Sequence, residues 1–178
     1  KDGDACIDLG SGPLTAVIAL WLSRPELRAL NLTWYCVDIS PTALSLGEDL
    51  FLSVAARTLS EEMENKWKII RVKGQLGTSI KRKAKLLICA NMFNEVFQSE
   101  SRPLDFLAKK YSEDLTRYGD KKTSYLVIEP GIPRSARFIS LLRDTFIRKD
   151  MTITAPCSHC EICPMDGRFP YRNGGRSM

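Results

Sequence analysis

The chain has 178 residues, of which 44% are hydrophobic and 26% charged, and its formal net charge is +5 at pH 7. A chain of this size buries roughly 70% of its unfolded surface without disulfide bonds, and its apolar runs are too short to span a bilayer, so we expect neither a membrane segment nor a secretory signal. The basic excess is mild and is compatible with contact to RNA or a ribosome without establishing it.

Apolar runs alternate with helical patterns along the chain, which is typical of a parallel sheet with crossover helices. The sequence therefore predicts an α/β, Rossmann-like fold with a central, mostly parallel sheet flanked by helices. Because such sheets usually carry strands beyond the fifth, we expect the chain to be cut at both ends. In chain order we predict a strand at 5–9, helix 15–22, strand 33–37, helix 41–59, strands 67–72 and 85–90, helix 104–118, strand 124–128, helix 135–146 and a last strand at 151–154.

A glycine turn follows the first predicted strand. Gly10 and Gly12 let the backbone turn tightly and approach a ligand closely, and the following helix offers N–H groups at its amino end. Asp38 ends the second strand, where a carboxylate can accept both hydroxyl groups of a ribose. These features predict a nucleotide-cofactor site. The residues that we expect to contact the cofactor are Asp8, Gly10, Ser11, Gly12, Pro13, Asp38, Ile39, Ser40, Gln75, Ala90 and Asn91.

Two cofactors compete for this turn. A dinucleotide would require glycine or alanine close to Thr15, so that residue fits poorly. Asp8, directly before the turn, resembles instead the first motif of class I S-adenosylmethionine-dependent methyltransferases. That resemblance implies that the turn holds the amino acid part of the cofactor and Asp38 its ribose. Leu14 stands where that family usually has glycine.

The fourth predicted strand ends in polar residues. Ligand crevices lie at the carboxyl ends of the strands in open α/β sheets, so Asn91, Asn94 and Glu95 are candidates for contact with the methyl acceptor. Asn94 and Glu95 serve equally well as caps of the next helix. We assign no general base. The Asn-Pro-Pro-aromatic signature of amino-methylating nucleic-acid enzymes is missing, so methylation of an exocyclic amine is not supported.

Three cysteines near the end of the chain, Cys157, Cys160 and Cys163, have C-x-x-C-x-x-C spacing, with His159 among them. Thiols this close can all reach one metal ion or iron–sulfur cluster. Spacing alone leaves an iron–sulfur cluster, a zinc site that includes His159, and a ligand-free loop open. The remaining cysteines lie inside predicted buried strands, which favours a reducing compartment.

Basic residues cluster twice. Lys81, Arg82, Lys83 and Lys85 are more often a solvated loop than a binding site. The second cluster, beside the cysteines, consists of Arg168, Arg172 and Arg176.

The run from Ala155 to Cys157, with His159, Cys163 and Pro164, resembles the Rsm22-like family of methyltransferase-like proteins, which are associated with the small ribosomal subunit in bacteria and mitochondria. In the family pattern a proline stands at the position of Ser158, and Cys160 is additional. The resemblance implies a 4Fe-4S cluster held by four cysteines, two of them at Cys157 and Cys163. It also implies a domain at 1–154 that binds S-adenosylmethionine and an incomplete cysteine-rich loop at 155–178.

The resemblance implies that the protein is an S-adenosylmethionine-dependent methyltransferase that acts on the small ribosomal subunit or its rRNA. The alternative is a non-catalytic assembly factor that binds S-adenosylmethionine and an iron–sulfur cluster. A third interpretation is a small-molecule methyltransferase or a nicotinamide-dependent dehydrogenase, but neither explains the cysteine loop. We expect a monomer in the bacterial cytoplasm, or alternatively in the mitochondrial matrix.

Overall fold

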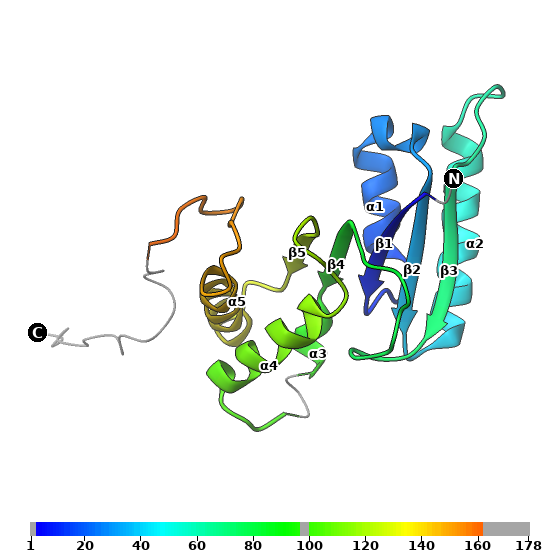
Figure 1. Cartoon of the computed structure of the whole chain (residues 1–178). Coiled ribbons are helices and arrows are strands. Elements are labelled where there is room, and N and C mark those ends of the chain that lie inside the picture. The colour runs from blue at the N-terminus through cyan, green and yellow to red at the C-terminus, as the bar shows by residue number, and fades with distance from the viewer. Residues whose placement is uncertain (1–2, 97–99, 162–178) are drawn as a thin grey trace, which may run out of the picture. The chain divides into compact units, whose positions relative to one another are not determined.

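The computed structural model describes residues 3–96 and 100–161. Its strands form one parallel sheet in the order β3-β2-β1-β4-β5 (Figure 1). This is the order of a Rossmann-like sheet, so the predicted fold class is confirmed. The strands are β1 (Asp4–Leu9), β2 (Leu32–Asp38), β3 (Trp67–Lys73), β4 (Leu86–Ala90) and β5 (Ser124–Ile128). The helices are α1 (Thr15–Ser23), the short η1 (Pro25–Ala29), α2 (Pro41–Thr58), α3 (Met92–Val96), α4 (Leu104–Thr116) and α5 (Pro133–Ile147).

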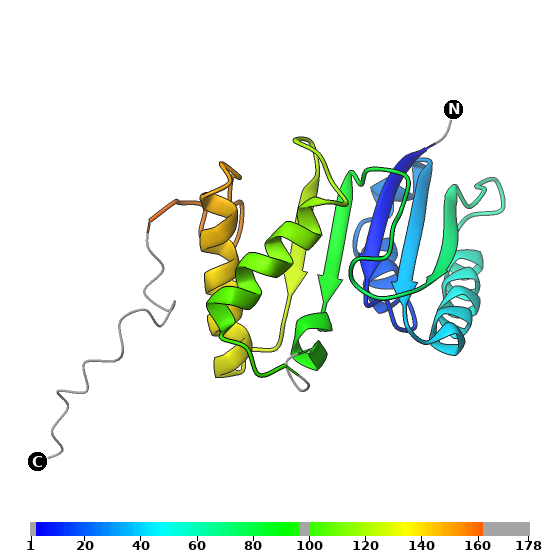
Figure 2. The same ribbon diagram turned by 60° about the horizontal axis from the view of Figure 1, so that its bottom comes forward.

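The parallel register brings the carboxyl ends of the strands to one edge of the sheet, as both ribbon views show (Figure 2). β1 is central: its last residue, Leu9, lies opposite Val37 of β2 and Cys89 of β4. The turn after β1 therefore emerges between the ends of β2 and β4. This is the crevice in which open α/β sheets bind their ligands.

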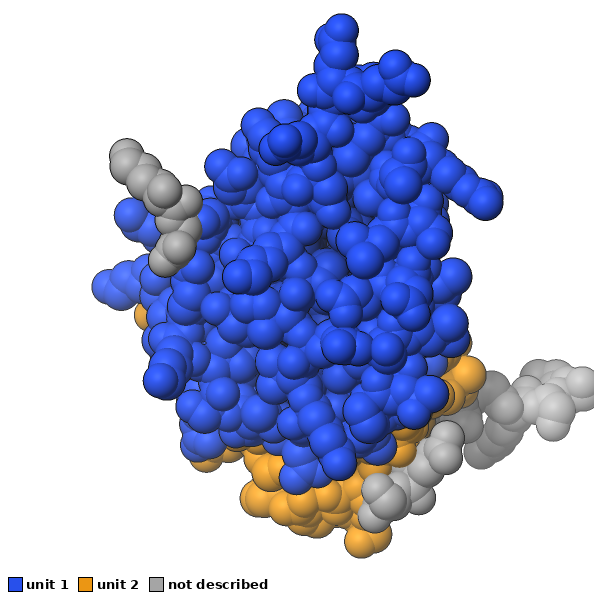
Figure 3. Space-filling model, turned by 90° about the vertical axis from the view of Figure 1, so that its right-hand side faces the viewer, with its two compact units in different colours: residues 1–92, 116–128 blue, residues 93–115, 129–178 orange. Residues whose placement is uncertain are grey.

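The chain forms two compact units that interleave in the sequence (Figure 3). Unit 1 comprises residues 1–92 and 116–128, and unit 2 comprises 93–115 and 129–178. The whole sheet, with α1 and α2, belongs to unit 1. The boundary predicted at 154/155 falls inside unit 2 and stays a prediction, because residues 162–178 lie outside the described part.

The core of unit 1 is built around indole rings. Trp21 of α1 lies edge-on to Trp67 of β3, with ring centroids 5.0 Å apart, and edge-on to Phe51 of α2, at 5.3 Å. Trp34 of β2 lies 5.6 Å from Trp67. Such large side chains dominate the apolar area that a small domain buries. They fix α1 and α2 against β2 and β3.

Arg28 of η1 fastens this helical turn to the same core. Its guanidinium donates to the carbonyl groups of Trp21 (3.0 Å) and Thr58 (3.1 Å) and lies 5.1 Å from the centroid of the Trp21 ring. η1 has five residues, which is too short a segment to show helical periodicity, so the sequence alone does not predict it.

Unit 2 has an aromatic core of its own. Phe93 of α3 lies 5.2 Å from Tyr111 of α4 and 4.8 Å from Phe138 of α5, measured between ring centroids. Tyr111 also contacts Phe138, at 6.3 Å. These rings join the helices of unit 2.

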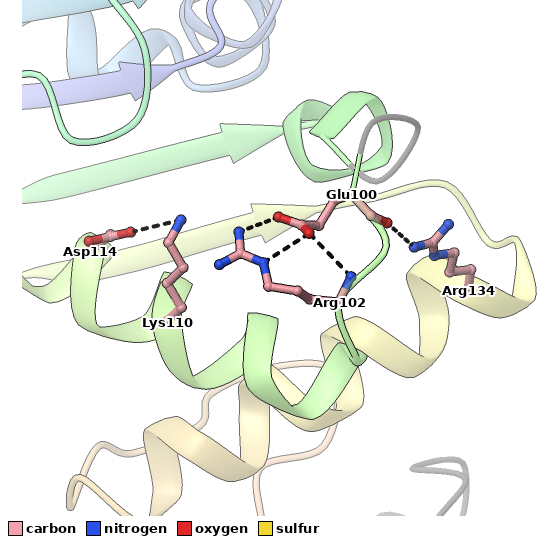
Figure 4. Close-up of polar contacts among 5 residues, drawn as sticks. All are labelled: Glu100, Arg102, Lys110, Asp114 and Arg134. Atoms are coloured by element: carbon pink, nitrogen blue, oxygen red, sulfur yellow. Dashed lines mark hydrogen bonds and ion pairs between the residues drawn. The ribbon is translucent and has the colours of Figure 1, made fainter.

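A polar network at the start of α4 adds to unit 2 (Figure 4). Glu100 accepts hydrogen bonds from the main chain (3.2 Å) and the Nε (2.9 Å) of Arg102, and this pairing lowers the pKa of Glu100 to about 2. Arg134 of α5 donates to the carbonyl oxygen of Glu100 at 2.9 Å. Within α4, Lys110 and Asp114 form an ion pair at 3.9 Å. The segment before α4 is thereby tied to the amino end of α5.

The strand predicted at 151–154 is wrong: these residues have no regular structure. The backbone of Asp150 is left-handed (φ 57°), its N–H donates to Ile147 at 3.0 Å, and the N–H of Met151 donates to Phe146 at 3.1 Å. This is a Schellman motif, which ends α5 and uses the N–H groups there. No helix of the described residues combines the length and the apolar character that crossing a membrane requires.

Candidate cofactor site

The turn between β1 and α1 is tied to the end of β2. The N–H groups of Gly10 and Ser11 both donate to the carbonyl oxygen of Val37, at 2.9 and 3.0 Å. Gly10 and Gly12 have positive φ angles of 68° and 49°, which glycine adopts without strain. A Cβ atom at Gly10 would lie 2.9 Å from Cγ of Met92, whereas the space beside Gly12 is open. Gly10 thus serves packing, and Gly12 leaves its side of the turn accessible.

Asp38 joins three segments at the carboxyl edge. Its Oδ2 accepts from the N–H of Gly12 and its Oδ1 from the N–H of Ser40, both at 2.8 Å. Its main-chain carbonyl accepts from Gly74, directly after β3, at 2.9 Å. A carboxylate has about four acceptor positions, so each oxygen can take one further donor. Asp38 therefore shapes the turn and keeps capacity for a ligand hydroxyl.

Asp8 is a buried acid at the end of β1. Only 1% of the residue is exposed, and its Oδ2 has no hydrogen-bond partner among the described residues. Burial raises the pKa of Asp8 to about 7; the nearby Asp38 adds to this shift, and the Ser11 hydroxyl opposes it. An unpaired buried carboxyl is unfavourable unless a donor reaches it. Asp8 is thus suited to a positively charged or N–H-bearing ligand group.

Leu14 occupies a position that favours glycine. Its backbone is left-handed (φ 59°, ψ 30°), it precedes α1 without a side-chain cap, and its side chain is fully buried. The conformation costs about 1–2 kcal/mol for a residue with a Cβ atom. Gly47 of α2 makes room, since a Cβ atom there would lie 2.5 Å from the carbonyl carbon of Pro13 and 2.8 Å from the nitrogen of Leu14. The leucine side chain instead joins the tryptophan core.

The other predicted contact residues also lie at this edge of unit 1. Ile39 is 71% exposed directly after Asp38, although it is a large apolar residue. Gln75 is exposed in the loop after β3, where its N–H donates to the Thr78 hydroxyl at 3.0 Å. Asn91 follows β4 and Ala90 with a positive φ of 57°. Unit 1 alone therefore brings together all the residues predicted for the cofactor.

The acceptor-side candidates Asn94 and Glu95 lie in α3, within unit 2. The carboxylate of Glu129 accepts from the N–H groups of Phe93 (2.8 Å) and Asn94 (2.9 Å). The amino end of α3 is thus capped by Glu129, a role that sequence reasoning did not assign. An acidic residue at the carboxyl end of a strand, as Asp38 is for β2, was the signal that could have identified it.

The cysteine loop is held by Arg143 of α5. Its guanidinium donates to the carbonyl groups of His159 and, at 3.1 Å, of Glu161. Cys157 and Cys160 are exposed, and none of the described cysteines is in a disulfide. Cys163 lies outside the described residues, and within them no three potential ligands form a group that could hold a metal ion. Cys6, Cys36 and Cys89 are buried, as predicted, and burial raises the pKa of Cys6 to about 12.

The parallel sheet with its acid-glycine-glycine turn defines a Rossmann-like domain of the kind that binds nucleotide cofactors. Residues 3–171 match the model of the family described as mitochondrial small ribosomal subunit Rsm22. The chain belongs to this family. A comparison with curated proteins gives no significant match.

Several solved structures are similar to the chain at low sequence identity. A methyltransferase from Geobacter sulfurreducens in complex with S-adenosyl-L-homocysteine is 14% identical (TM-score 0.45; 77% of this chain, 48% of that chain). A Listeria monocytogenes protein assigned to the class I S-adenosylmethionine-dependent methyltransferases is 19% identical (0.47; 84% and 46%). A Trichomonas vaginalis lactate dehydrogenase is 12% identical (0.47; 80% and 42%). The chain spans about half the length of these structures, and similarity at this level carries no functional argument.

Proposed function

We propose that the chain is an S-adenosylmethionine-dependent, methyltransferase-like protein that acts on the small ribosomal subunit or its rRNA. The family membership over residues 3–171 carries the ribosomal part of the proposal. The family description also favours the mitochondrial matrix over a bacterial cytoplasm as its location.

The cofactor part rests on the turn. The unpartnered Oδ2 of Asp8 fits the ammonium group of a methionine moiety, whose charge would favour the ionised acid. Asp38 keeps acceptor positions for ribose hydroxyls, and exposed Ile39 offers an apolar surface to an adenine ring. When bound, the cofactor supplies the electrophilic methyl group. The protein contributes binding and orientation: it holds the methyl group in line with the acceptor atom, and this proximity, rather than acid–base chemistry, promotes the transfer.

Calorimetry with S-adenosylmethionine and S-adenosylhomocysteine tests the cofactor site. Asp38→Ala removes a charged acceptor, so the Kd should rise roughly 10- to 100-fold. Asp49→Asn, at an exposed position of α2, is the control and should leave the Kd unchanged. A wild-type chain that binds neither compound at millimolar concentration would contradict the proposal.

One observation favours the non-catalytic alternative. Leu14 fills, with a buried side chain, a left-handed position where methyltransferases usually have glycine. Transfer of a labelled methyl group from S-adenosylmethionine to purified small subunits separates the alternatives. Incorporation supports an enzyme, and cofactor binding without incorporation supports an assembly factor.

We also propose that Cys157, Cys160 and Cys163 bind a 4Fe-4S cluster, with zinc as the alternative. The two described thiols are exposed on a loop fixed by Arg143, which is compatible with a soft metal centre. Metal analysis and visible absorbance of protein purified without oxygen test this. Bound iron with a brown colour supports the cluster, whereas colourless, zinc-containing protein contradicts it.

A further inference from the structure

Two loops rich in lysine and arginine meet at the amino edge of the sheet, opposite the cofactor turn. One leads into β4 and the other into β5, and the ribbon views show both loops at the same end of these strands (Figures 1 and 2). The basic side chains that they carry form what we call the amino-edge patch: Lys81, Arg82, Lys83, Lys85, Arg117, Lys121 and Lys122.

Hydrogen bonds hold the two loops together. The N–H of Ala84 donates to the carbonyl oxygen of Tyr118 at 2.8 Å. The ammonium group of Lys83 donates to the main-chain carbonyl oxygen of Arg117 at 2.6 Å. The N–H of Ser124 donates to Lys85 at 2.8 Å. The patch is therefore one surface of fixed backbone, formed by segments more than 30 residues apart in the sequence.

Positive charge dominates this surface. Asp120 is the acidic residue of the two loops, and Asp4 lies close by at the start of β1, next to Ala5, whose carbonyl oxygen accepts from the N–H of Lys85. The patch itself has seven basic residues. The side chains of Lys81, Lys85 and Lys121 make no hydrogen bond or ion pair with any described residue, and all three residues are exposed. Their charges remain available to a partner from outside the chain.

From this arrangement we infer that the amino-edge patch is the surface by which the protein binds the phosphate backbone of RNA in the small ribosomal subunit. The inference rests on the ribosomal part of the proposed function. Closely spaced cations displace the counterions that surround a nucleic acid, which makes binding favourable at low salt. A bilayer is a poorer partner, because the described residues of both loops expose no large apolar side chain for insertion.

The patch is separate from the cofactor turn. β4 has five residues, so it places about 16 Å between the patch and the carboxyl edge. RNA held there would leave the cofactor turn open. Changes in the patch should therefore leave binding of S-adenosylhomocysteine intact, and this serves as a check of folding.

The test compares two variants of the whole chain that lose the same charge. The patch variant carries K81Q, K85Q, K121Q and K122Q, and the control carries R57Q, K66Q, K68Q and K149Q at exposed positions outside the two loops. Binding to protein-free small-subunit rRNA and to purified small subunits is measured at several salt concentrations. Calorimetry with S-adenosylhomocysteine and circular dichroism monitor the fold.

We expect the patch variant to bind rRNA at least roughly tenfold more weakly and to lose about 3 from the slope of log K against log salt, while the control changes little. Equal losses in both variants, or no loss in the patch variant, would overturn the inference. Weaker binding to subunits with unchanged affinity for rRNA would point to an acidic protein partner and overturn it as well. A wild-type chain that binds neither subunits nor rRNA would overturn the ribosomal part of the proposed function itself.

Discussion

At the residue scale, Asp8 combines nearly complete burial with an oxygen that has no partner among the described residues. Its pKa is about 7 in the folded chain and near 4 when unfolded. The folded state therefore holds a proton that the unfolded state releases between these values. The resulting stability is complete below about pH 4 and is lost as the pH rises through 7.

Asp8→Asn should remove this pH dependence. Between about pH 4 and 7 the wild type should lose up to about 1.4 kcal/mol of unfolding free energy per pH unit relative to the variant. Denaturant unfolding at several pH values measures the difference. Parallel stability curves for the two proteins would show that Asp8 has an ordinary pKa in the fold.

Trp34 and Trp67 differ in whether the indole N–H has a hydrogen-bond partner, which gives a second prediction. The indole N–H of Trp67 donates to Leu27 at 3.1 Å, whereas that of Trp34 is buried without a partner in the described structure. Trp34→Phe should therefore cost about 1 kcal/mol less than Trp67→Phe, because it removes an unsatisfied donor. Urea unfolding of both variants tests this, and an equal or larger cost for Trp34→Phe would contradict it.

At the element scale, Gly47 lets α2 pack closely against the backbone of the turn at Pro13 and Leu14. Gly47→Ala would place a methyl group 2.5 Å from the backbone of Pro13, and the resulting strain of about 1–3 kcal/mol exceeds the gain of about 1 kcal/mol in helix propensity. We expect lower stability and weaker cofactor binding, since Pro13 belongs to the turn. Ser53→Ala, at an exposed position of the same helix, should be neutral or stabilising. Thermal unfolding and calorimetry compare the two.

The link between α5 and the cysteine loop gives a further prediction. Arg143→Gln should speed hydrogen exchange over residues 155–161, because the donors to the His159 and Glu161 carbonyl groups are lost. Arg148→Gln is the matched control, since the exposed Arg148 side chain makes, within the described part of the chain, an ion pair with Asp144 at 3.9 Å and no hydrogen bond or ion pair with the cysteine loop. Equal exchange in the two variants would show that Arg143 does not hold the loop.

The sequence predicted elements with clear periodicity or strong end signals. The helix at Pro41 is an example: Ser40 accepts from Ala43 at 3.2 Å, and the proline stands in the first turn, as expected. Short elements without period, such as α3, could not be predicted. Nor could contacts between distant segments, because the distance in the sequence between Gly12 and Asp38, or between Glu129 and Asn94, carries no signal of proximity.

The predicted cofactor residues illustrate the same limit. Their common place at the carboxyl edge follows from strand order, which alternating strands and helices already imply. The left-handed backbone of Leu14 and the missing partner of Asp8 depend instead on packing against α2 and β2. These features became apparent only in the folded chain.

At the scale of the whole molecule, the interleaved units make a prediction about where a ligand stabilises the chain. All predicted cofactor contacts belong to unit 1. This unit consists of residues 1–92 and of a second segment, residues 116–128, which contains β5. S-adenosylhomocysteine at 100 times its Kd should stabilise the binding unit by about 2.7 kcal/mol. We expect slower hydrogen exchange at the amides of Gly10, Ser11 and Gly12, because the hydrogen bonds that these N–H groups donate join the turn to β2.

Exchange in α5 of unit 2 should change much less, because local opening of one unit need not expose the other. Hydrogen exchange with mass spectrometry, with and without the ligand, measures both regions in one sample. The Asp38→Ala variant is the control, since it should lose the protection of the turn without altering α5. Equal slowing in the turn and in α5 would show that both units open only in a single global unfolding step, so that ligand binding at the turn stabilises the entire chain.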